Sequence, residues 1–285
     1  MKTILTADLH IRKTRPRCRL DPDWLGTQRK TLQYIVDVTN EKKTNLIIVG
    51  DIFHTSRQSA EMINMAIDIL KGVEKKVYIL PGQHDLPYHE YGNEHRSAYG
   101  VLKRTFNEID IVKGLFNHIF TENKMEIFFL HTLTFPSKKE QPMPDIGITA
   151  EDLLKKYPKA KWIFTGDYHK AFHYEKNDHH VVNPGCVLRQ ASDFIDYKPT
   201  VYYVDTDKGI VEPIPLPDTS KIIVTDAYIK LEKEREDRIE SFISMVEKQG
   251  KVTLNFMNNL KERMETKKIN SGTKDVLMEI IEEIN

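Results

Sequence analysis

Short apolar runs alternate with amphipathic segments along the first third of this 285-residue chain. The runs Thr3–Ala7, Leu46–Val49 and Val77–Leu80 are continuous, as is typical of buried strands in a parallel sheet. Between and after them, apolar residues recur with helical spacing over three segments, 26–43, 57–72 and 94–107. This β-α-β-α-β order predicts a sheet whose faces are covered by helices.

The pattern then changes to short strands with few long helices between them. We expect these strands at Ile109–Val112, His118–Phe120, Met125–Leu130, Trp162–Thr165, Ala171–Tyr174, His180–Val182, Thr200–Val204 and Ile210–Pro213. A loop rich in proline is expected at 136–148. The run of strands favours a second sheet packed against the first.

A proline-rich stretch, Pro213–Pro217, is typical of an extended linker and divides the chain into domains 1–217 and 218–285. In the second domain we expect a strand at Ile222–Leu231 and charged amphipathic helices at 234–249 and 273–284. Their apolar stripes can pack on the first domain or dock onto a partner, and the pattern leaves both possibilities open.

Side chains that bind metals follow five of the predicted strands. The clusters are Asp8-Leu9-His10, Gly50-Asp51, Gly82-Gln83-His84-Asp85, His131 and Gly166-Asp167-Tyr168-His169. One Asp-x-His or Gly-Asp pair is a weak signal, because aspartate is common in turns. Five clusters at strand ends, however, can converge at one edge of a sheet and bind two divalent cations. Two cations about 3.5–4 Å apart are a device for splitting phosphate esters.

The amino-acid composition limits which binding partners and which cellular compartment are expected. The 42 basic and 42 acidic residues balance, so only a local patch can attract nucleic acid. The two cysteines, Cys18 and Cys186, argue against a disulfide scaffold and suit a reducing cytoplasm. No apolar run approaches the roughly 20 residues that span a bilayer, and the first run is too short for a signal peptide. We therefore expect a cytoplasmic protein with no membrane partner.

The order of the five clusters resembles that of the calcineurin-like metallophosphoesterases, over about residues 1–215. That family carries Asp-x-His, Gly-Asp, Gly-Asn-His-Asp/Glu, His and Gly-His-x-His. Three finer features resemble the SbcD-type DNA exonuclease branch, the Mre nucleases of double-strand-break repair: Gly50–His54, Pro81–Asp85 and Asn183–Cys186. The resemblance implies a four-layer α/β/β/α sandwich with a small C-terminal α+β cap domain.

The resemblance also implies a ligand set. The first metal would be held by Asp8, His10, Asp51 and His169, and the second by Asp51, Gln83, His131 and Asp167, with Asp51 bridging the two. Gln83 and Asp167 depart from the family's Asn and His. Because Asp167 makes the second site harder and more negative, we expect Mn²⁺, with Mg²⁺ as the alternative. Both substitutes are oxygen ligands, so the chain is expected to remain catalytic.

Three further residues receive catalytic roles from the same resemblance. His84 would be the histidine beside the metals that gives a proton to the leaving alkoxide. Asp85 would orient the His84 imidazole and favour its protonated form. His54 would contact the phosphate, with a plain surface histidine as the equal alternative.

Binding partners are predicted from the charged surface residues and from the resemblance to the SbcD-type branch. The basic stretch Lys13, Arg15, Arg17 and Arg19 follows the first ligand pair and would contact DNA phosphates, unless it is only a solvated face. Relatives work with a long coiled-coil ATPase of the SbcC type and form homodimers through helices equivalent to 57–72 and 94–107. Candidates for the dimer interface or the core are Met62, Met65 and Tyr99.

The predicted function is a DNA exonuclease and endonuclease that trims DNA ends in recombination and double-strand-break repair. One alternative is a phosphodiesterase or phosphatase acting on a small nucleotide or a protein. The other is a non-catalytic DNA-end-binding subunit with an altered second metal site. The remaining histidines lack ligand-type spacing, and surface or hydrogen-bonding roles are expected for His89, His95, His118, His173, His179 and His180.

Overall fold

A computed structural model of the chain describes residues 1–217 except 109–116, 123–124, 144, 192–193 and 195. These residues belong to a compact unit, Met1–Val224. The expected strand Ile109–Val112 and the whole second domain, 218–285, lie outside the described residues. None of the helices in the described part is long and apolar enough to cross a membrane.

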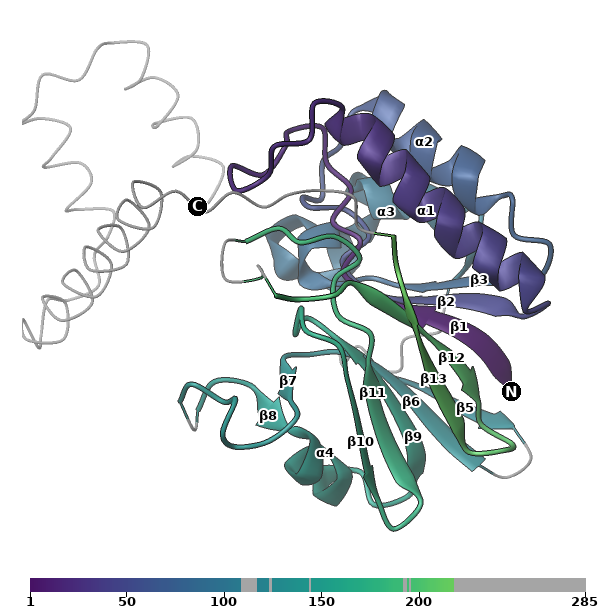
Figure 1. Ribbon diagram of the computed structural model, residues 1–285, viewed down its shortest axis with the longest axis vertical. Coiled ribbons are helices and arrows are strands. Elements are labelled where there is room, and N and C mark those ends of the chain that lie inside the picture. Colours follow the sequence, from purple (N-terminus) through teal and green to yellow (C-terminus); the bar gives the residue numbers. More distant parts are fainter. Residues whose placement is uncertain (109–116, 123–124, 144, 192–193, 195, 218–285) are drawn as a thin grey trace, which may run out of the picture. The chain divides into compact units, whose positions relative to one another are not determined.

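The first sheet has six strands in the order β13-β12-β1-β2-β3-β4 (Figure 1). Four neighbours run parallel: β1 (Lys2–Thr6), β2 (Asn45–Val49), β3 (Val77–Leu80) and β4 (Asn107–Glu108). The other two, β12 (Thr200–Asp205) and β13 (Ile210–Pro215), are antiparallel and extend the sheet beyond β1. The predicted parallel strands are thus confirmed, with bounds shifted by a residue or two. Thr200–Val204 and Ile210–Pro213, which were expected in the second sheet, belong to the first sheet instead.

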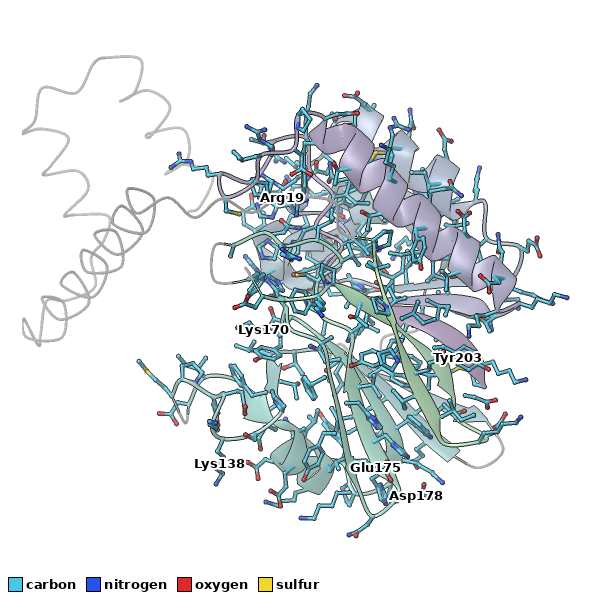
Figure 2. All side chains as sticks on the ribbon, in the orientation of Figure 1. Arg19, Lys138, Lys170, Glu175, Asp178 and Tyr203 are labelled. Carbon is cyan, nitrogen blue, oxygen red and sulfur yellow. The ribbon has the colours of Figure 1, made fainter. Side chains whose placement is uncertain are left out.

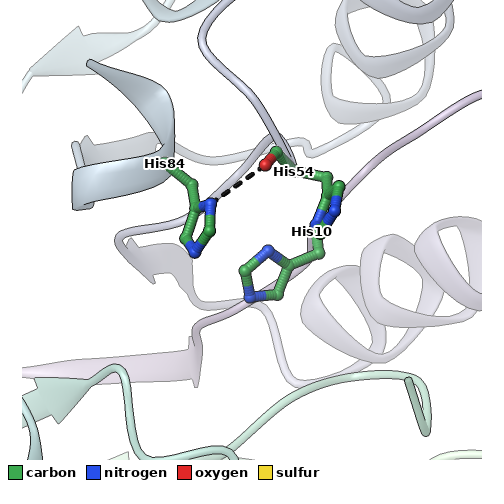
Figure 3. A group of neighbouring side chains, drawn as sticks. All are labelled: His10, His54 and His84. Carbon is green, nitrogen blue, oxygen red and sulfur yellow. Dashed lines mark hydrogen bonds between the residues drawn. The ribbon is translucent and has the colours of Figure 1, made fainter. Parts of the chain in front are cut away.

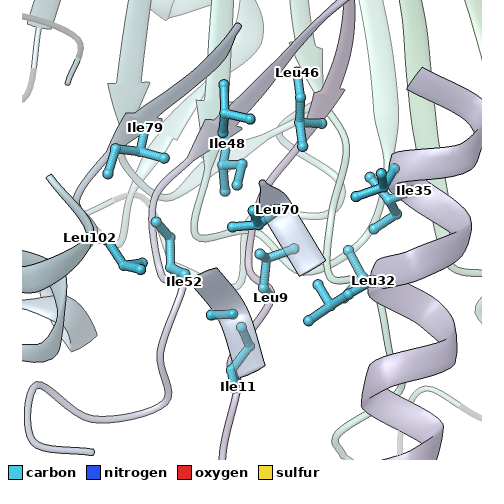
Figure 4. Close-up of a cluster of buried hydrophobic side chains, with 14 of the residues drawn as sticks. Leu9, Ile11, Leu32, Ile35, Leu46, Ile48, Ile52, Leu70, Ile79 and Leu102 are labelled. Carbon is cyan, nitrogen blue, oxygen red and sulfur yellow. The ribbon is translucent and has the colours of Figure 1, made fainter. Parts of the chain in front are cut away.

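Three helices cover the outer face of this sheet: α1 (Trp24–Glu41), α2 (Ala60–Leu70) and α3 (Ala98–Leu102). In α1, Leu32 and Ile35 fall on one face and meet Leu46 and Ile48 of the sheet in one buried cluster (Figure 4). Each fully buried side chain of this size contributes about 1.5–3 kcal/mol. The helices are therefore fixed on the sheet by their apolar stripes.

The second sheet has the order β10-β11-β9-β6-β5. Its strands are β5 (Asn117–Glu122), β6 (Met125–His131), β9 (Ala160–Gly166), β10 (Phe172–Lys176) and β11 (His179–Asn183). One apolar cluster joins the two sheets, with Leu5 and Val49 from the first and Trp162 and Phe164 from the second. Another lies under α4 (Ala150–Lys156) on the opposite face. The layers are α/β/β/α, as predicted.

One helix prediction needs correction, and one further helix has no counterpart among the predictions. The segment 94–107 is not one helix, because a 3₁₀ turn, Tyr91–Arg96, precedes the five residues of α3. Ser97 caps α3 by accepting from Gly100 N, and a Cβ on Gly100 would lie 2.2 Å from Glu94 O, so the turn packs tightly on the helix. The short helix α4 was not predicted at all. Its sequence signal is the Thr149 cap followed by two acidic residues.

The loop and linker predictions also change. Within 136–148, the last residue joins β8 (Ile148–Thr149), which pairs in parallel with β7 (Thr134–Phe135). The predicted linker Pro213–Pro217 continues β13 as far as Pro215. Proline fits there because β13 is an edge strand, whose outward N–H groups need no partner.

Candidate metal centre

The five clusters lie at the carboxyl ends of β1, β2, β3, β6 and β9, with His131 as the last residue of β6. Backbone hydrogen bonds hold the loop after β1 beside the loop after β2. Asp8 N donates to Gly50 O (3.1 Å), and His10 N donates to Asp51 O (3.0 Å). The parallel order of β1 and β2 places these loops next to each other. The position of both carboxylates is therefore set by the backbone of the sheet.

Four of the predicted ligands have left-handed backbone conformations. The φ angles are 50° at Asp8, 45° at His10, 49° at Asp51 and 79° at Asp167. Such a conformation costs a residue other than glycine on the order of 1–3 kcal/mol and is typical of functional sites. The sharp turns aim these side chains back over the sheet edge instead of along the chain.

Asp51 and His131 form the innermost pair of the centre. Asp51 Oδ2 lies 3.2 Å from His131 Nε2, and both side chains are fully buried. The His131 ring is fixed at its other nitrogen, since Nδ1 lies 2.8 Å from Val49 O and donates to it. In the described part of the chain, Asp51 Oδ2 and His131 Nε2 have no hydrogen-bond partner. Asp8 Oδ1 lies 3.9 Å from the same Nε2, so three donors face one point.

A second group of donors contains His10, His169 and again Asp8. His10 Nε2 and His169 Nε2 are 3.1 Å apart, and His169 Nε2 is 4.0 Å from Asp8 Oδ1. Burial lowers the pKa of both imidazoles, which leaves them neutral with a lone pair for a cation. Asp51 Oδ2 is also 3.9 Å from His10 Nε2. The carboxylates of Asp8 and Asp51 therefore lie between the two donor groups. Either carboxylate can bind a cation in each group.

Charge within the centre is strongly coupled. Burial raises the pKa of Asp8 well above its usual range. Burial also opposes ionisation of Asp51, but the neighbouring His131 outweighs it and lowers the Asp51 pKa. For His131, burial is outweighed by Asp51, and the pKa rises to about 10. Without a cation, a proton on His131 thus balances the buried carboxylate, and a divalent cation can replace that proton.

The two residues that depart from the family pattern bind each other. Gln83 Nε2 donates to Asp167 Oδ1 at 2.6 Å, and the backbone N–H of Asp167 donates to Asp8 (3.1 and 3.2 Å). The longer glutamine therefore spans the distance to the shorter aspartate. Asp8, His10, Asp51, His131 and His169 belong to the two donor groups, and the bond from the Asp167 backbone to Asp8 brings Gln83 and Asp167 beside them. Oxygen and imidazole atoms are of the types that divalent cations bind.

His84 stands at the open side of the centre, with 39% of its side chain exposed. Its Nδ1 lies 3.0 Å from the carbonyl oxygen of His54, and this bond turns Nε2 toward Asp51 Oδ2, 4.0 Å away (Figure 3). The rings of His54 and His84 are stacked, with an interplanar angle of 12°. Burial, helped by Arg12, lowers the pKa of His54 to about 4, so that His54 is neutral near pH 7.

The expected role of Asp85 is wrong. Its carboxylate does not hold the His84 ring but accepts three backbone bonds, from Ile52 N (3.0 Å), Phe53 N (2.8 Å) and Gly82 N (3.0 Å). The 3₁₀ turn Gln83–Asp85 directs this side chain inward, whereas His84 faces the centre. Asp85 thus ties the loop after β3 to the loop after β2. Burial, with the charge of Asp51, raises its pKa to about 7.

The basic stretch divides into exposed and buried members. Lys13, Arg15 and Arg17 are exposed on the loop between β1 and α1. Arg19 is fully buried, paired with Asp21 at 2.8 Å, and therefore does not present its charge to a DNA phosphate. The prediction that groups Arg19 with the surface residues is corrected on this point.

The candidate interface residues Met62, Met65 and Tyr99 also lie inside the molecule. All three are buried in the core cluster beneath α2 and α3, because their positions on those helices face the sheet. They pack the domain, and any dimer contact through these helices must use other side chains.

Sequence reasoning missed a residue that supports the His169 loop. Asn183 is fully buried at the end of β11, and its side-chain amide donates to Lys170 O (3.0 Å) and to Tyr168 O. Cys186 N donates to His169 O (3.0 Å). In the sequence, the run Asn183-Pro184-Gly185-Cys186 shows only a resemblance to the nuclease branch. Its place directly after a buried strand is the signal that could have revealed this support.

Comparison with known proteins gives the family. Residues 1–204 match the family model described as calcineurin-like phosphoesterase. No curated protein matches. An archaeal phosphodiesterase is similar in structure, with 15% identity, 76% of this chain and 100% of that chain covered, and a TM-score of 0.46.

Two other solved structures are similar at the same low level. TT1561 of Thermus thermophilus has 11% identity, covers 75% of this chain and 98% of its own, and has a TM-score of 0.47. For Vps29 of Entamoeba histolytica, complexed with Zn²⁺, the identity is 14%, the coverage 75% and 98%, and the TM-score 0.39. Because the family model matches residues 1–204, this chain belongs to the calcineurin-like phosphoesterases.

Replacing Asp85 tests its structural role. We expect Asp85→Asn to lower the free energy of unfolding by about 1–3 kcal/mol, because an amide NH₂ must face a backbone donor. Asp68→Asn, on the exposed side of α2, is the matched control and should change stability by less than about 0.5 kcal/mol. Urea denaturation of both variants measures the difference. Equal stability of the two variants contradicts the role.

Cation binding should release a proton from His131. Its raised pKa of about 10 means that the metal-free site is protonated near neutral pH. That proton stabilises the metal-free protein fully below pH 6.5, and the contribution is lost as pH rises through about 10. Affinity for Mn²⁺ should therefore rise with pH toward that value. Calorimetric titrations in buffers of different ionisation enthalpy count the protons, and a count of zero at pH 7.5 refutes the expectation.

Asp167→Asn tests the altered half of the centre. The change keeps the shape of the side chain but removes its charge, so that half should bind Mn²⁺ at least about tenfold more weakly. Equilibrium dialysis against Mn²⁺ would show a loss of up to one equivalent. Unchanged binding together with unchanged hydrolysis removes Asp167 from the site.

Proposed function

We propose that this calcineurin-like phosphoesterase is a divalent-metal-dependent DNA exonuclease and endonuclease that trims ends in recombination and double-strand-break repair. The observation that carries the proposal is the loop between β1 and α1. It leaves the centre at His10 and exposes Lys13, Arg15 and Arg17 immediately afterwards. Because the chain has no net charge, only a local group of cations can attract a phosphate backbone, and these residues supply one beside the donor set. Lys13 is also paired with Glu61 at 3.3 Å, so Arg15 and Arg17 carry most of this attraction.

The loop is held in a defined position, which strengthens the proposal. Buried Arg19 binds both oxygens of Asp21 (2.8 and 3.0 Å), donates to Arg189 O (2.9 Å), and lies over the ring of Trp24 at 5.0 Å. This anchor is prearranged, so the exposed cations lose little freedom when a ligand binds. Arg19 acts here as a support for the basic loop and not as a contact to DNA.

The chemistry proposed for the centre is hydrolysis of a phosphodiester. When bound, two divalent cations lower the pKa of water and stabilise charge on the phosphate. Asp8, His10, Asp51 and His169 would hold one of them, and Asp51, Gln83, His131 and Asp167 the other. We take Mn²⁺ as the cation, with Mg²⁺ as the alternative, because carboxylate and amide oxygens dominate the second set.

His84 is the proposed proton donor to the leaving alkoxide. The bond between Nδ1 and the His54 carbonyl fixes the ring, so the open Nε2 can hold the proton. Its partial exposure gives a substrate room to reach it. His54, stacked on His84 and neutral, is proposed to contact the phosphate as a hydrogen-bond partner.

Two partners belong to the same proposal. One is a coiled-coil ATPase of the SbcC type, and the other is a second copy of the chain bound through α2 and α3. The outward face of α2 offers Glu61, Asn64 and Asp68, and α3 offers Val101. A homodimer would therefore rest on these side chains.

The altered residues favour a second candidate, a DNA-end-binding subunit without catalysis. Gln83 and Asp167 are bound to each other, which uses part of their capacity to hold a cation. A small-molecule phosphodiesterase is the third candidate and would use the same donors. Activity toward DNA and toward a small diester separates the three.

His84→Ala should abolish nuclease activity without removing the metals. We expect a fall of about 10²–10⁴-fold in kcat on end-labelled DNA with Mn²⁺, since a positioned proton donor is removed. His89→Ala, four residues from the 3₁₀ turn that carries His84 and exposed, is the matched control. No hydrolysis by the wild-type protein, with DNA binding intact, would support the non-catalytic candidate instead.

A triple change of Lys13, Arg15 and Arg17 to Ala separates DNA from small substrates. It should raise KM for duplex DNA and reduce the dependence of binding on salt, by about 0.9 in the log–log slope for each phosphate that is no longer neutralised. Hydrolysis of bis(p-nitrophenyl) phosphate should stay unchanged. The control is the triple change of Lys71, Lys75 and Lys76, exposed lysines before β3, at the opposite end of that strand from the centre. Equal effects of the two triple variants would argue for general charge and against a DNA-binding loop.

A further inference from the structure

A second group of metal-type ligands lies on the β10–β11 hairpin, outside the centre described above. Its members are His173 and Glu175 on β10 and His180 on β11. Glu175 is paired directly with His180, and His173 is paired with Val182, two residues further along β11. The period of two along a strand then places all three side chains on one face of the hairpin.

The nitrogen atoms of the two histidines approach each other closely. His173 Nε2 lies 3.1 Å from His180 Nδ1, and Glu175 Oε2 lies 3.8 Å from the same Nδ1. Two nitrogens bound to one zinc ion at about 2.0–2.1 Å in tetrahedral geometry are about 3.3 Å apart. The imidazole pair already has nearly this spacing. Glu175 is exposed and can move the remaining distance by rotation of its side chain.

His180 is held rigidly from behind. It is 1% exposed, and its ring is stacked on Trp162 with centroids 3.9 Å apart and an interplanar angle of 11°. Its Nε2 is buried and has no hydrogen-bond partner among the residues that the structure describes, and Asp178 Oδ1 is 3.6 Å away. A histidine that binds a metal through one nitrogen usually directs its other N–H at a carboxylate. Figure 2 shows Glu175 and Asp178 close together at the end of this hairpin.

We propose that His173, Glu175 and His180 form a separate site for one borderline divalent cation, for which Zn²⁺ is the natural occupant. Two imidazoles and one carboxylate are a known zinc ligand set, with a further position for water. Burial lowers the pKa of both histidines, which keeps their lone pairs free near neutral pH. The predicted hydrogen-bonding role is confirmed for His179, which bonds Ala160 O at 2.8 Å, and for His180, which bonds His173. His180 is, however, buried and does not lie at the surface.

The site has a structural use in this fold. Strand β10 is the edge of the second sheet, and it begins directly after the loop that carries Asp167 and His169. An edge strand has only one neighbour to fix it. A cation bound by β10 and β11 together would fasten the edge strand and, through it, one end of the catalytic loop.

The competing explanation is a plain hydrogen bond between the two imidazoles. In that case one ring donates and the other accepts, and no cation is needed. The two explanations differ in zinc stoichiometry and in the response of stability to zinc.

Equilibrium dialysis of the full chain against buffered Zn²⁺ tests the proposal. The wild-type protein should bind one more equivalent than His173→Ala, whereas His179→Ala, the neighbouring histidine on the opposite face, should bind as many as the wild type. Glu175→Gln should weaken the extra equivalent by about tenfold or more. Hydrolysis of a small phosphodiester with Mn²⁺ should be the same in wild type and His173→Ala, because the dinuclear centre is untouched.

Thermal unfolding provides the second readout. Zn²⁺ should raise the Tm of the wild type more than that of His173→Ala, because an additional bound ligand stabilises the folded state. With a chelator present, the two proteins should unfold at similar temperatures, since His173 is exposed. The proposal is overturned if His173→Ala binds as much zinc as the wild type, if His179→Ala loses the same equivalent, or if the Tm difference persists unchanged in the chelator.

Discussion

The burial of two carboxylates at the edge of the first sheet is the constraint on which the rest of the centre depends. Asp8 and Asp51 are both fully buried, with Asp8 Oδ1 and Asp51 Oδ2 within 4 Å of the same His131 nitrogen. A buried, unpaired charge is expensive, so each group is either kept protonated, as the raised pKa of Asp8 favours, or balanced by a cationic partner. A protonated His131 can balance one carboxylate in the metal-free protein. Divalent cations can balance both, which makes the folded chain a receptor for metal.

The surrounding loops hold that burial in place. The bond from Asp8 N to Gly50 O, and the bonds that Asp85 accepts from Ile52 N and Phe53 N in the loop after β2, fasten neighbouring strand ends to one another. Asn183 does the same for the loop of His169. These supports come from backbone groups and buried side chains, so they can oppose the left-handed strain at the ligands. The same contacts therefore determine both the stability of the scaffold and the geometry of the centre.

The sequence predicted the features that depend on pattern and missed those that depend on tertiary partners. Continuous apolar runs located β1, β2 and β3, and their ends located the ligands. The run at 94–107 misled because helical spacing does not reveal the tight packing of Gly100 on Glu94. The sequence groups Arg19 with the surface cations because it does not show that Arg19 pairs with Asp21. This ion pair allows the Arg19 side chain to be buried. Asp85 was given the wrong partner, since its neighbour in sequence is not its neighbour in space.

The contact between Gln83 and Asp167 shows how a departure from the sequence pattern can be explained by a tertiary partner. Each looks like a defect when it is compared alone with the family pattern, because one is too long and the other carries a charge in place of an imidazole. In the structure the amide of Gln83 reaches Asp167 at 2.6 Å, and the Asp167 backbone reaches Asp8. The longer side chain compensates the shorter one, so the pair keeps oxygen donors at the second half of the centre. The contact therefore makes the two substituted residues one structural pair, held beside Asp8 by the Asp167 backbone.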